Sequence, residues 1–300
     1  MRGYSPHAPL HRLHGSNEAQ SHMRIALGVE YDGSRFCGWQ TQPAGCAVQD
    51  VIERALAEIA GEPVATVCAG RTDAGVHALA QVVHFDTGVH RPESAWVRGV
   101  NTLLPPACAV NWSQPVADDF HARYSARARH YRYLLLNHPV RPAADQARVG
   151  WFHLPLELEK MQQAARLLIG EHDFSAFRSS ECQAKTPVRT LTRLDVARRG
   201  DHLVFDFCAN AFLQHMVRNI VGCLVYVGKG KHPPDWLGEV LAGRDRSRAA
   251  PTFEAAGLYL SRVEYDARWG LPGAQRSTLV DTASANGPVV NGKLDARSAV

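Results

Sequence analysis

Long apolar runs are missing from this sequence. No stretch of the 300 residues approaches the roughly 18 consecutive apolar residues that span a membrane as a helix. The first 22 residues are polar and His-rich, without the apolar central segment of a signal peptide. The seven cysteines are odd in number and show no CxxC spacing, so we expect neither a disulfide framework nor a zinc site. These absences predict a protein of the reducing cytoplasm with no membrane partner.

The common cofactor motifs are missing as well. There is no GxxxxGK[ST] loop and no GxGxxG after a strand, so we expect no nucleotide cofactor. No GxSxG elbow is present, which disfavours a serine hydrolase of that type. His84 and His90 have no acidic or cysteine partner at ligand spacing, so we expect no metal site.

The composition is that of a globular protein. Hydrophobic residues make up 45% of the chain and charged residues 21%, which is enough for a substantial core. A length of 300 residues suggests two domains or one large one. The net charge of +4 permits an anionic partner but does not require one.

The middle of the chain contains two similar halves. In the first, alternating residues predict a strand over 23–31, helical spacing predicts a helix closed by Gly61, and strands are expected near 65–69 and 79–86. A helix over 92–104 and a strand near 107–115 complete this half. The second half repeats the order with strands at 131–136, 189–198, 202–208 and 258–264, and with helices at 158–168, 213–224 and 234–241. Each half therefore has the order β-α-β-β-α-β, the split βαβ pattern.

We expect an α+β fold built from two tandem ferredoxin-like (RRM-like) units. Their sheets would join edge to edge into one mixed, largely antiparallel sheet, with helices on one face and the bare face forming a central cleft. The expected division is a disordered tail at 1–22, subdomains at 23–120 and 121–268, and a second disordered tail at 269–300. Because a clean strand begins at Met23, either Met1 or Met23 is a possible start.

One loop stands out between the two strands near 65–69 and 79–86. In the sequence GRTDAGVHA at 70–78, Asp73 follows Arg71 by two residues and lies between two glycines. Glycine permits a sharp turn, and a charged loop held between apolar strands is often functional. The alternative is a surface turn with an incidental ion pair.

Three basic segments offer contacts for an anionic polymer. Arginines and tyrosines crowd residues 123–133, where Tyr131 begins an aromatic strand, and rings of this kind stack on unpaired bases. The alternative is a core-facing aromatic strand with solvated arginines. Further basic side chains gather over 178–193 and 244–248. Arg218 lies one step off the apolar stripe of the predicted helix 213–224, so it either reaches the helix rim or faces a buried anion.

Five segments of the chain carry a pattern that is specific to one family. They are 32–40 (DGSRFCGWQ), 70–78 (GRTDAGVHA), 129–133 (RHYRY), 173–177 (DFSAF) and 212–222 (FLQHMVRNIVG). In this order, from about Met23 to Tyr265, the chain resembles the tRNA pseudouridine synthase A family. Only His130 departs, since that family usually has arginine there.

The resemblance implies a function. It implies conversion of uridine to pseudouridine at positions 38, 39 and 40 in the anticodon stem-loop of tRNA, without cofactor or metal, by a homodimer. It further implies that Asp73 is the catalytic carboxylate, that Tyr131 stacks on the target base, that Arg218 pairs with Asp73, and that Arg71 helps to hold the flipped nucleotide. The carboxylate would attack C1′ of the ribose or C6 of the base, or would remove the 2′-proton.

Two other functions are compatible with some of these features. One is a non-catalytic RNA-binding or RNA-chaperone module with paired RRM-like sheets, although a carboxylate in a basic cleft would repel phosphate without a chemical task. The other is a nucleoside glycosidase, but that chemistry commonly uses two carboxylates about 5–10 Å apart and the loop offers one.

Overall fold

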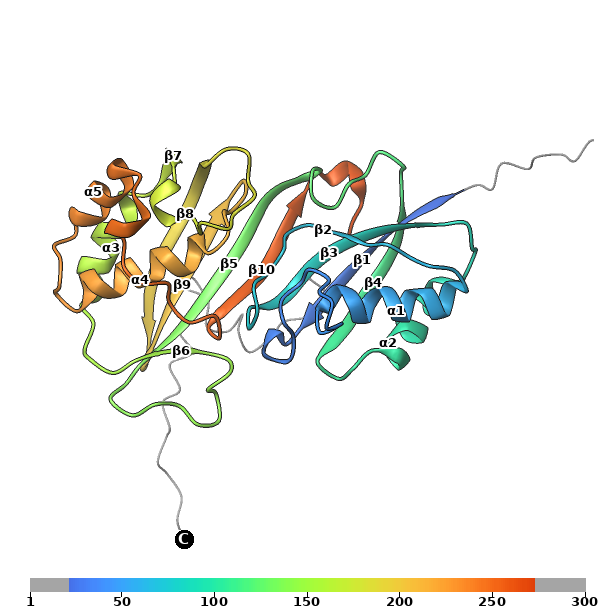
Figure 1. Ribbon diagram of the computed structural model, residues 1–300, viewed down its shortest axis with the longest axis horizontal. Coiled ribbons are helices and arrows are strands. Elements are labelled where there is room, and N and C mark those ends of the chain that lie inside the picture. Colours follow the sequence, from blue (N-terminus) through green and yellow to red (C-terminus); the bar gives the residue numbers. More distant parts are fainter. Residues whose placement is uncertain (1–21, 273–300) are drawn as a thin grey trace, which may run out of the picture.

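The computed structural model describes residues 22–272. Most of the two tails expected at 1–22 and 269–300 lies outside the described residues. The structure therefore does not bear on whether the chain starts at Met1 or at Met23. One mixed sheet runs through the molecule (Figure 1). Its ten strands are β1 (Met23–Tyr31), β2 (Val67–Cys68), β3 (His77–Thr87), β4 (Cys108–Val116), β5 (Ala126–Asn137), β6 (Gly150–Phe152), β7 (Gly170–Asp173), β8 (Val188–Arg199), β9 (His202–Ala209) and β10 (Leu258–Tyr265).

The helices agree with the expected repeat. They are α1 (Val48–Ala60), α2 (Val100–Leu103), α3 (Leu158–Arg166), α4 (Met216–Gly228) and α5 (Trp236–Gly243). A π-helical segment, η2 (Ala95–Gly99), precedes α2, and single 3-10 turns lie at η1 (Gly33–Arg35), η3 (Ser175–Phe177), η4 (Arg246–Arg248) and η5 (Ala267–Trp269). Gly61 ends α1 with a φ of 77°, so the prediction that this glycine closes the helix is confirmed.

The strand order confirms two fused RRM-like units. The strands run β4-β1-β3-β10-β5-β9-β8-β7, so each half keeps its own antiparallel set and β10 joins the two. β2 is only two residues long and pairs with the middle of β3, at Val83 and His84. The first residues of β3 are therefore open, and β10 pairs with them in parallel at His77 and Ala78. The β10–β3 and β5–β6 pairs are parallel and the other strand pairs are antiparallel, as expected.

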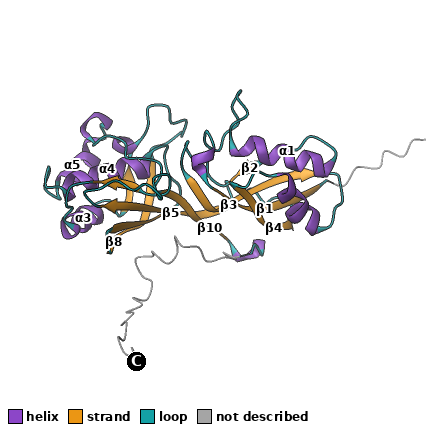
Figure 2. Cartoon of the chain, turned by 90° about the horizontal axis from the view of Figure 1, so that it is seen from below, coloured by secondary structure: helices purple, strands orange, loops and turns teal. Residues whose placement is uncertain are grey.

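One face of the sheet carries the helices (Figure 2). Ile25, Leu27 and Val29 alternate along β1 and belong to the main core, together with buried residues of α1, α3, α4 and α5. Apolar alternation on strands and apolar stripes on helices pack against each other in this way. Burial of this surface is the main stabilising contribution to the fold.

The opposite face is not bare in the first half, which corrects one expectation. Phe120, Ala122 and Trp269 form a second buried cluster there with Ala26 and Val82. Trp269 is 8% exposed and contacts Phe120 with ring centroids 5.2 Å apart, although the tail boundary was expected at this residue. Successive side chains of a strand point to opposite faces, so Ala26 points away from its neighbours Ile25 and Leu27 in the main core. The second cluster therefore covers the face opposite the helices.

A buried histidine in this second cluster predicts a pH effect on stability. The His84 side chain is 4% exposed, and its Nδ1 accepts a hydrogen bond from the backbone N–H of Ala122 at 3.1 Å. Burial lowers the pKa of His84 to about 4, and the nearby charges of Arg24 and His121 act in the same direction. The ring is therefore held neutral in the folded protein.

Because the folded-state pKa of His84 lies below its unfolded value, stability should fall as pH drops from about 6.5 towards 4. The loss attributable to this residue is at most about 3.4 kcal/mol, since each pKa unit carries 1.36 kcal/mol and the pKa falls from 6.5 to about 4. In the variant His84→Asn, the side-chain oxygen can still accept from the Ala122 N–H but does not titrate. We expect the unfolding free energy of this variant, measured by urea titration, to decline less between pH 7 and pH 4.5 than that of the wild type. Equal slopes in both proteins would contradict this explanation.

Candidate active site

The loop that carries Asp73 is fixed by a buried glutamine. Residues 69–76 connect β2 to β3, and Gln81 of β3 contacts the backbone of Gly70 twice. Its Nε2 donates to the Gly70 carbonyl at 2.6 Å, and its Oε1 accepts from the Gly70 N–H at 3.3 Å. Gln81 is fully buried, so these bonds do not compete with water. The loop backbone therefore has one defined position relative to the sheet.

Thr72 anchors the loop from its other side. The hydroxyl groups of Thr72 and Tyr31 lie 2.8 Å apart in a hydrogen bond, and the Trp39 N–H donates to the Thr72 carbonyl at 2.9 Å. Gly38 has a φ of 102°, and a Cβ there would lie 3.0 Å from the Thr72 carbonyl oxygen. The segment before α1 therefore packs directly on the loop, and glycine is required at the contact.

The structure corrects the expectation about cysteines. Cys37 and Cys46 form a disulfide in this same segment, and the Cys37 N–H donates to the Cys46 carbonyl at 3.0 Å. The two residues are nine positions apart, so the absence of CxxC spacing did not exclude the pairing. The remaining cysteines of the described residues are free thiols. Among them, burial raises the pKa of Cys68 to about 12, so this thiol beneath the loop is not a nucleophile.

Arg129 holds the loop from the second half of the chain. Its Nε and Nη2 donate to the carbonyl of Ala69 at 3.3 and 3.0 Å, and its Nη1 donates to the Asn210 carbonyl at 2.8 Å. The side chain is 8% exposed. The interpretation of this arginine as part of a solvent-facing basic surface is therefore wrong; it is a structural bridge between β5 and the loop.

His77 closes the loop on its C-terminal side. Its Nδ1 accepts from the Gly33 N–H at 3.1 Å, and its Nε2 lies 2.9 and 3.0 Å from the carbonyl oxygens of Ala147 and Ala256. The ring also stacks on Tyr259 with centroids 4.6 Å apart. Burial lowers the pKa of His77, although nearby Asp32 opposes this effect. The neutral ring thus connects three segments at the point where β3 meets β10.

Asp73 meets two cation-forming side chains at the start of α4. Arg218 Nη1 and His215 Nε2 both lie 3.4 Å from the same carboxylate oxygen, Oδ2. Within residues 22–272, no hydrogen bond or ion pair engages Oδ1. Asp73 keeps 27% of its side chain exposed. The protein therefore holds one oxygen of Asp73 and leaves the other, Oδ1, without a partner among residues 22–272.

Arg218 is itself held in place. Its Nε donates to the Phe253 carbonyl at 2.9 Å, and the Phe253 N–H donates to the Arg218 carbonyl at 3.2 Å. The Arg218 side chain keeps 16% of its surface exposed. Of the two possibilities for this arginine, the one that faces an anion is correct, and a charge placed in such a partly buried position acts more strongly than on an open surface.

His215 is the site residue that the sequence did not single out. It directly precedes Met216, the first residue of α4, and lies three positions before Arg218. Its φ of 63° is left-handed, which also explains why α4 begins at Met216 and not at 213 as expected. A non-glycine residue in this region carries backbone strain of about 1–2 kcal/mol. Such strain commonly occurs at functional sites.

Tyr131 lies below the loop on the face that carries the helices. Its ring meets Phe212 edge to face with centroids 5.0 Å apart, and its hydroxyl is 3.8 Å from the place of a Cβ on Gly70. Burial raises the pKa of Tyr131, and the charge of Asp73 raises it further, so the hydroxyl stays protonated. Tyr131 belongs to the main core, hence the site lies on the helix-covered face and not on the expected bare face.

Arg71 is the predicted site residue that does not join this cluster. Its side chain is exposed, and within residues 22–272 it makes neither a hydrogen bond nor an ion pair. The loop therefore presents one fixed carboxylate, Asp73, and one free guanidinium, Arg71. The described residues contain no group of three or more His, Cys, Asp or Glu side chains that is arranged to hold a metal ion. Nor do they include a helix both long and apolar enough to cross a bilayer.

The chain is similar to a family of known proteins. The family model described as tRNA pseudouridine synthase matches residues 28–125 and 164–266. A protein named tRNA pseudouridine synthase A from Dechloromonas aromatica (strain RCB) is 61% identical over 250 residues, which cover 83% of this chain and 95% of the relative. Proteins of the same name from Thiobacillus denitrificans (strain ATCC 25259 / T1) and Burkholderia multivorans (strain ATCC 17616 / 249) are each 60% identical, over 83% and 86% of this chain and 96% and 95% of the relatives.

The close contact between α4 and the 250–253 segment can be tested, because it determines the position of Arg218. A Cβ on Gly222, one turn beyond Arg218, would lie 2.4 Å from the backbone carbonyl oxygen of Pro251. Alanine normally stabilises a helix relative to glycine, but here it would push α4 from the 250–253 segment that holds Arg218. We expect Gly222→Ala to lower the unfolding free energy by about 1–3 kcal/mol in urea titration.

The matched control is Gly238→Ala in α5. There the nearest atom to the new Cβ is a side-chain carbon of Leu167 at 3.5 Å, an ordinary contact. This variant should gain about 0.5–1 kcal/mol, the usual advantage of alanine in a helix. A similar gain in Gly222→Ala would show that the close contact with Pro251 does not position α4.

Proposed function

Because this chain belongs to the tRNA pseudouridine synthase family, we propose that it isomerises uridine to pseudouridine in tRNA, at positions 38, 39 and 40 of the anticodon stem-loop. The contact between Asp73 and Arg218 carries the proposal. These residues are 145 positions apart, come from different halves of the chain and meet at 3.4 Å. Neither the motif at 70–78 nor the helix at 216–228 contains that contact by itself.

The reaction suits a site with one carboxylate. It breaks the C–N bond between ribose and base and forms a C–C bond to the same ribose, so nothing is added or removed overall. We assign Asp73 as the catalytic residue, acting through Oδ1 on C1′, on C6 or on the 2′-proton. Arg218 would balance the charge of the carboxylate and fix its orientation through Oδ2, and it would not act as an acid because guanidinium keeps its proton.

The remaining side chains suit a nucleotide taken out of its helix. A paired uridine is inaccessible, and extruding it costs a few kcal/mol. Stacking of the base on Tyr131 would offset that cost, since each base stacked on a ring gains about 1–3 kcal/mol. Arg71 is exposed and without a protein partner among residues 22–272, so it is available to hold the displaced nucleotide.

The alternative functions receive less support. A glycosidase of the common kind needs a second carboxylate about 5–10 Å from the first. The described ion-pair contacts of Asp73 are with Arg218 and His215, and neither side chain is a carboxylate. No observation favours a non-catalytic RNA-binding module, in which Asp73 would repel phosphate without a task.

The proposed partners are a tRNA, which follows from the reaction, and a second copy of the chain, which rests on the family resemblance alone. A tRNA would be bound in the cytoplasm, and we propose a homodimer in which one tRNA contacts both subunits. Sedimentation equilibrium of the purified chain should give twice the monomer mass of 32.9 kDa at micromolar concentration. A monomer at every concentration, with full activity, would rule out this assembly while leaving the reaction in place.

The reaction can be tested with Asp73→Asn, which removes the charge and keeps the shape. Transcripts labelled with tritium at C5 of uridine lose the label when the C–C bond forms. We expect the variant to release tritium at least about 10⁴-fold more slowly, as happens when an essential nucleophile or base is removed. Its affinity for tRNA should stay within about threefold of the wild type, because the amide can still contact the substrate.

Two controls separate chemistry from folding and from site choice. The variant Asp235→Asn has the same substitution at an exposed residue, and it should keep full activity. A transcript with cytidine at positions 38, 39 and 40 should release no tritium with the wild-type protein. Full turnover by Asp73→Asn would refute the assignment of the catalytic residue.

A further inference from the structure

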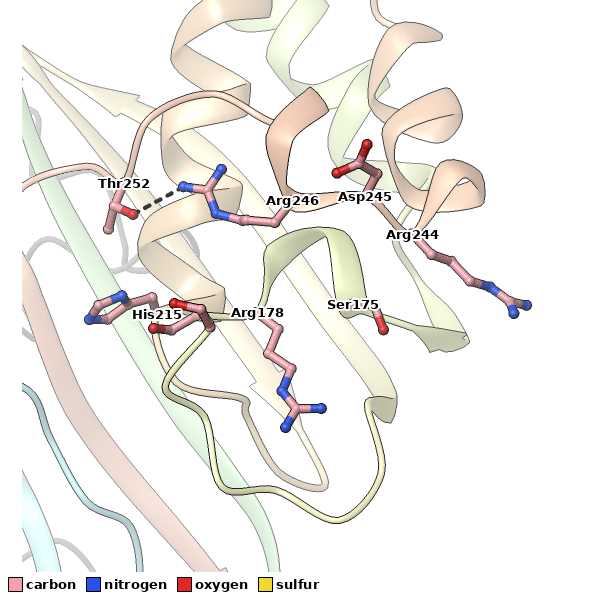
Figure 3. Close-up of a pocket in the computed structure, with 9 residues that line it drawn as sticks. Ser175, Arg178, His215, Arg244, Asp245, Arg246 and Thr252 are labelled. Atoms are coloured by element: carbon pink, nitrogen blue, oxygen red, sulfur yellow. Dashed lines mark hydrogen bonds between the residues drawn. The ribbon is translucent and has the colours of Figure 1, made fainter.

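A polar pocket opens beside Asp73 and has no part in the reaction as described so far. It encloses about 670 Å³ between the η3 turn, the start of α4 and the η4 turn (Figure 3). Its nine lining residues comprise three arginines, three serines, a threonine, a histidine and one aspartate. A ligand pocket of this size is usually lined mainly by apolar and aromatic side chains. A pocket without them suits a strongly polar ligand.

The pocket carries positive charge that the protein does not neutralise. Arg246 donates to the carbonyl of Ala250, to the side chain of Asn219 and to the hydroxyl of Thr252, all uncharged. Figure 3 shows Arg246 extended towards Thr252 along one side of the pocket. Arg178 donates to the carbonyls of Cys182 and Ala184, which are also uncharged. Hydrogen bonds to uncharged acceptors thus orient both guanidinium groups, and none of these bonds neutralises their charge.

The acidic side chains near the pocket do not cancel this charge. Asp245 is the one carboxylate in the lining; its pKa is lowered mainly by the Ser247 side chain, and it also accepts from the Ser247 N–H at 2.9 Å. Asp173 lies 3.5 Å from Arg244, which is 67% exposed. Asp173 pairs with Arg244, whereas Arg178 and Arg246 have uncharged hydrogen-bond partners. The three arginines thus outnumber the two carboxylates Asp173 and Asp245, so the pocket attracts an anion.

Backbone strain marks the same place. Within residues 22–272, His215 and Arg244 are the two non-glycine residues with a positive φ, at 63° and 52°. Both line this pocket. One begins α4 and the other ends α5, so the strain arises on two separate elements. Strain that gathers at one location from separate elements points to a functional constraint on that location.

The pocket is continuous with the catalytic group through one side chain. His215 belongs to its lining, and Nε2 of the same ring lies 3.4 Å from Asp73 Oδ2. A group in the pocket would therefore be one imidazole away from the reacting carboxylate. In a nucleotide that is bound at Asp73, the part that reaches past the ribose is its phosphodiester.

We propose that this pocket binds a phosphodiester of the tRNA strand, on the 5′ or the 3′ side of the target uridine. This inference rests on the proposed function, since it takes tRNA as the substrate. Arginines and hydroxyl groups are the usual partners of phosphate oxygens in RNA and DNA complexes. The one ring in the lining is the imidazole of His215, and it contacts the Asp73 carboxylate. The other lining side chains are arginines, hydroxyl groups and one carboxylate, so they favour the backbone as ligand over a neighbouring base. Holding the backbone there would keep the uridine extruded while Asp73 reacts.

The test pairs a charge on the protein with a charge on the RNA. Anticodon stem-loop RNAs are made with one target uridine and with a neutral methylphosphonate in place of its 5′ or its 3′ phosphate. Dissociation constants are measured in the Asp73→Asn background, which prevents turnover, with and without Arg178→Gln. We expect one of the two methylphosphonates to weaken binding about tenfold when Arg178 is present, the size of one charge-assisted hydrogen bond. In the Arg178→Gln protein, natural RNA should bind about tenfold more weakly than it binds to the protein with Arg178. In that variant, replacing the same phosphate by methylphosphonate should raise the dissociation constant further by less than about twofold.

The controls address loop structure and general charge. Arg178→Lys restores the charge without the forked hydrogen bonds and should recover most of the methylphosphonate effect. Arg262→Gln removes the same charge from the opposite face, where the side chain is 63% exposed, and should leave the methylphosphonate effect unchanged. If Arg178→Gln unfolds at a lower temperature, the exposed Arg244→Gln replaces it in the same measurement.

An equal methylphosphonate penalty with and without the pocket arginine, at both phosphates, would overturn the proposal. The proposed function has a separate readout, the release of tritium from tRNA by the wild-type protein. If release occurs but the coupling is missing, only the phosphodiester site is wrong. If release is missing while the coupling is present, the chain binds RNA at this pocket but the assigned reaction is wrong.

Discussion

The short parallel contact between β10 and β3 is the constraint on which the site depends. β10 reaches β3 only at His77 and Ala78, directly after the Asp73 loop, and on its other edge it pairs Leu260 with Tyr131. One strand therefore sets the distance between the loop of the first half and the aromatic strand of the second. This contact is possible because β2 is two residues long and leaves the start of β3 open. The shortest strand of the first half is what allows the two halves to share a site.

The ion pair at the centre of the site is a product of many weaker contacts. Asp73 is fixed through the neighbouring backbone by Gln81, Thr72 and Arg129, while Arg218 is fixed by Phe253. The pair is partly buried, with 16–27% of the side chains exposed, so desolvation of the two groups offsets much of their attraction at 3.4 Å and the pair adds little to stability. Its geometry is therefore maintained by the surrounding structure, before a substrate binds. That is the arrangement expected of preorganised charge in an active site.

The sequence predicted the elements with strong periodicity and missed those without it. α1 has an apolar stripe and a closing glycine, and β1 alternates cleanly, so both were predicted close to their observed bounds. β6 and β7 have three and four residues, too few to show a period. The left-handed backbone of His215, the burial of Arg129 and the Cys37–Cys46 bond depend on partners distant in sequence or on local chain path. Spacing alone contains no information about such partners, and the motif match supplied the site residues without their contacts.

Three histidines show that surroundings decide the role of a side chain here. His84 and His77 are buried and accept a backbone N–H, so each ring is neutral and serves to join segments. His215 has no such backbone donor on its ring among residues 22–272, keeps 27% of its side chain exposed and turns Nε2 towards the Asp73 carboxylate. Its position costs a left-handed backbone at the residue before α4. The strain is understandable if the ring must lie between the carboxylate and the polar pocket, because a right-handed start of the helix would direct the side chain elsewhere.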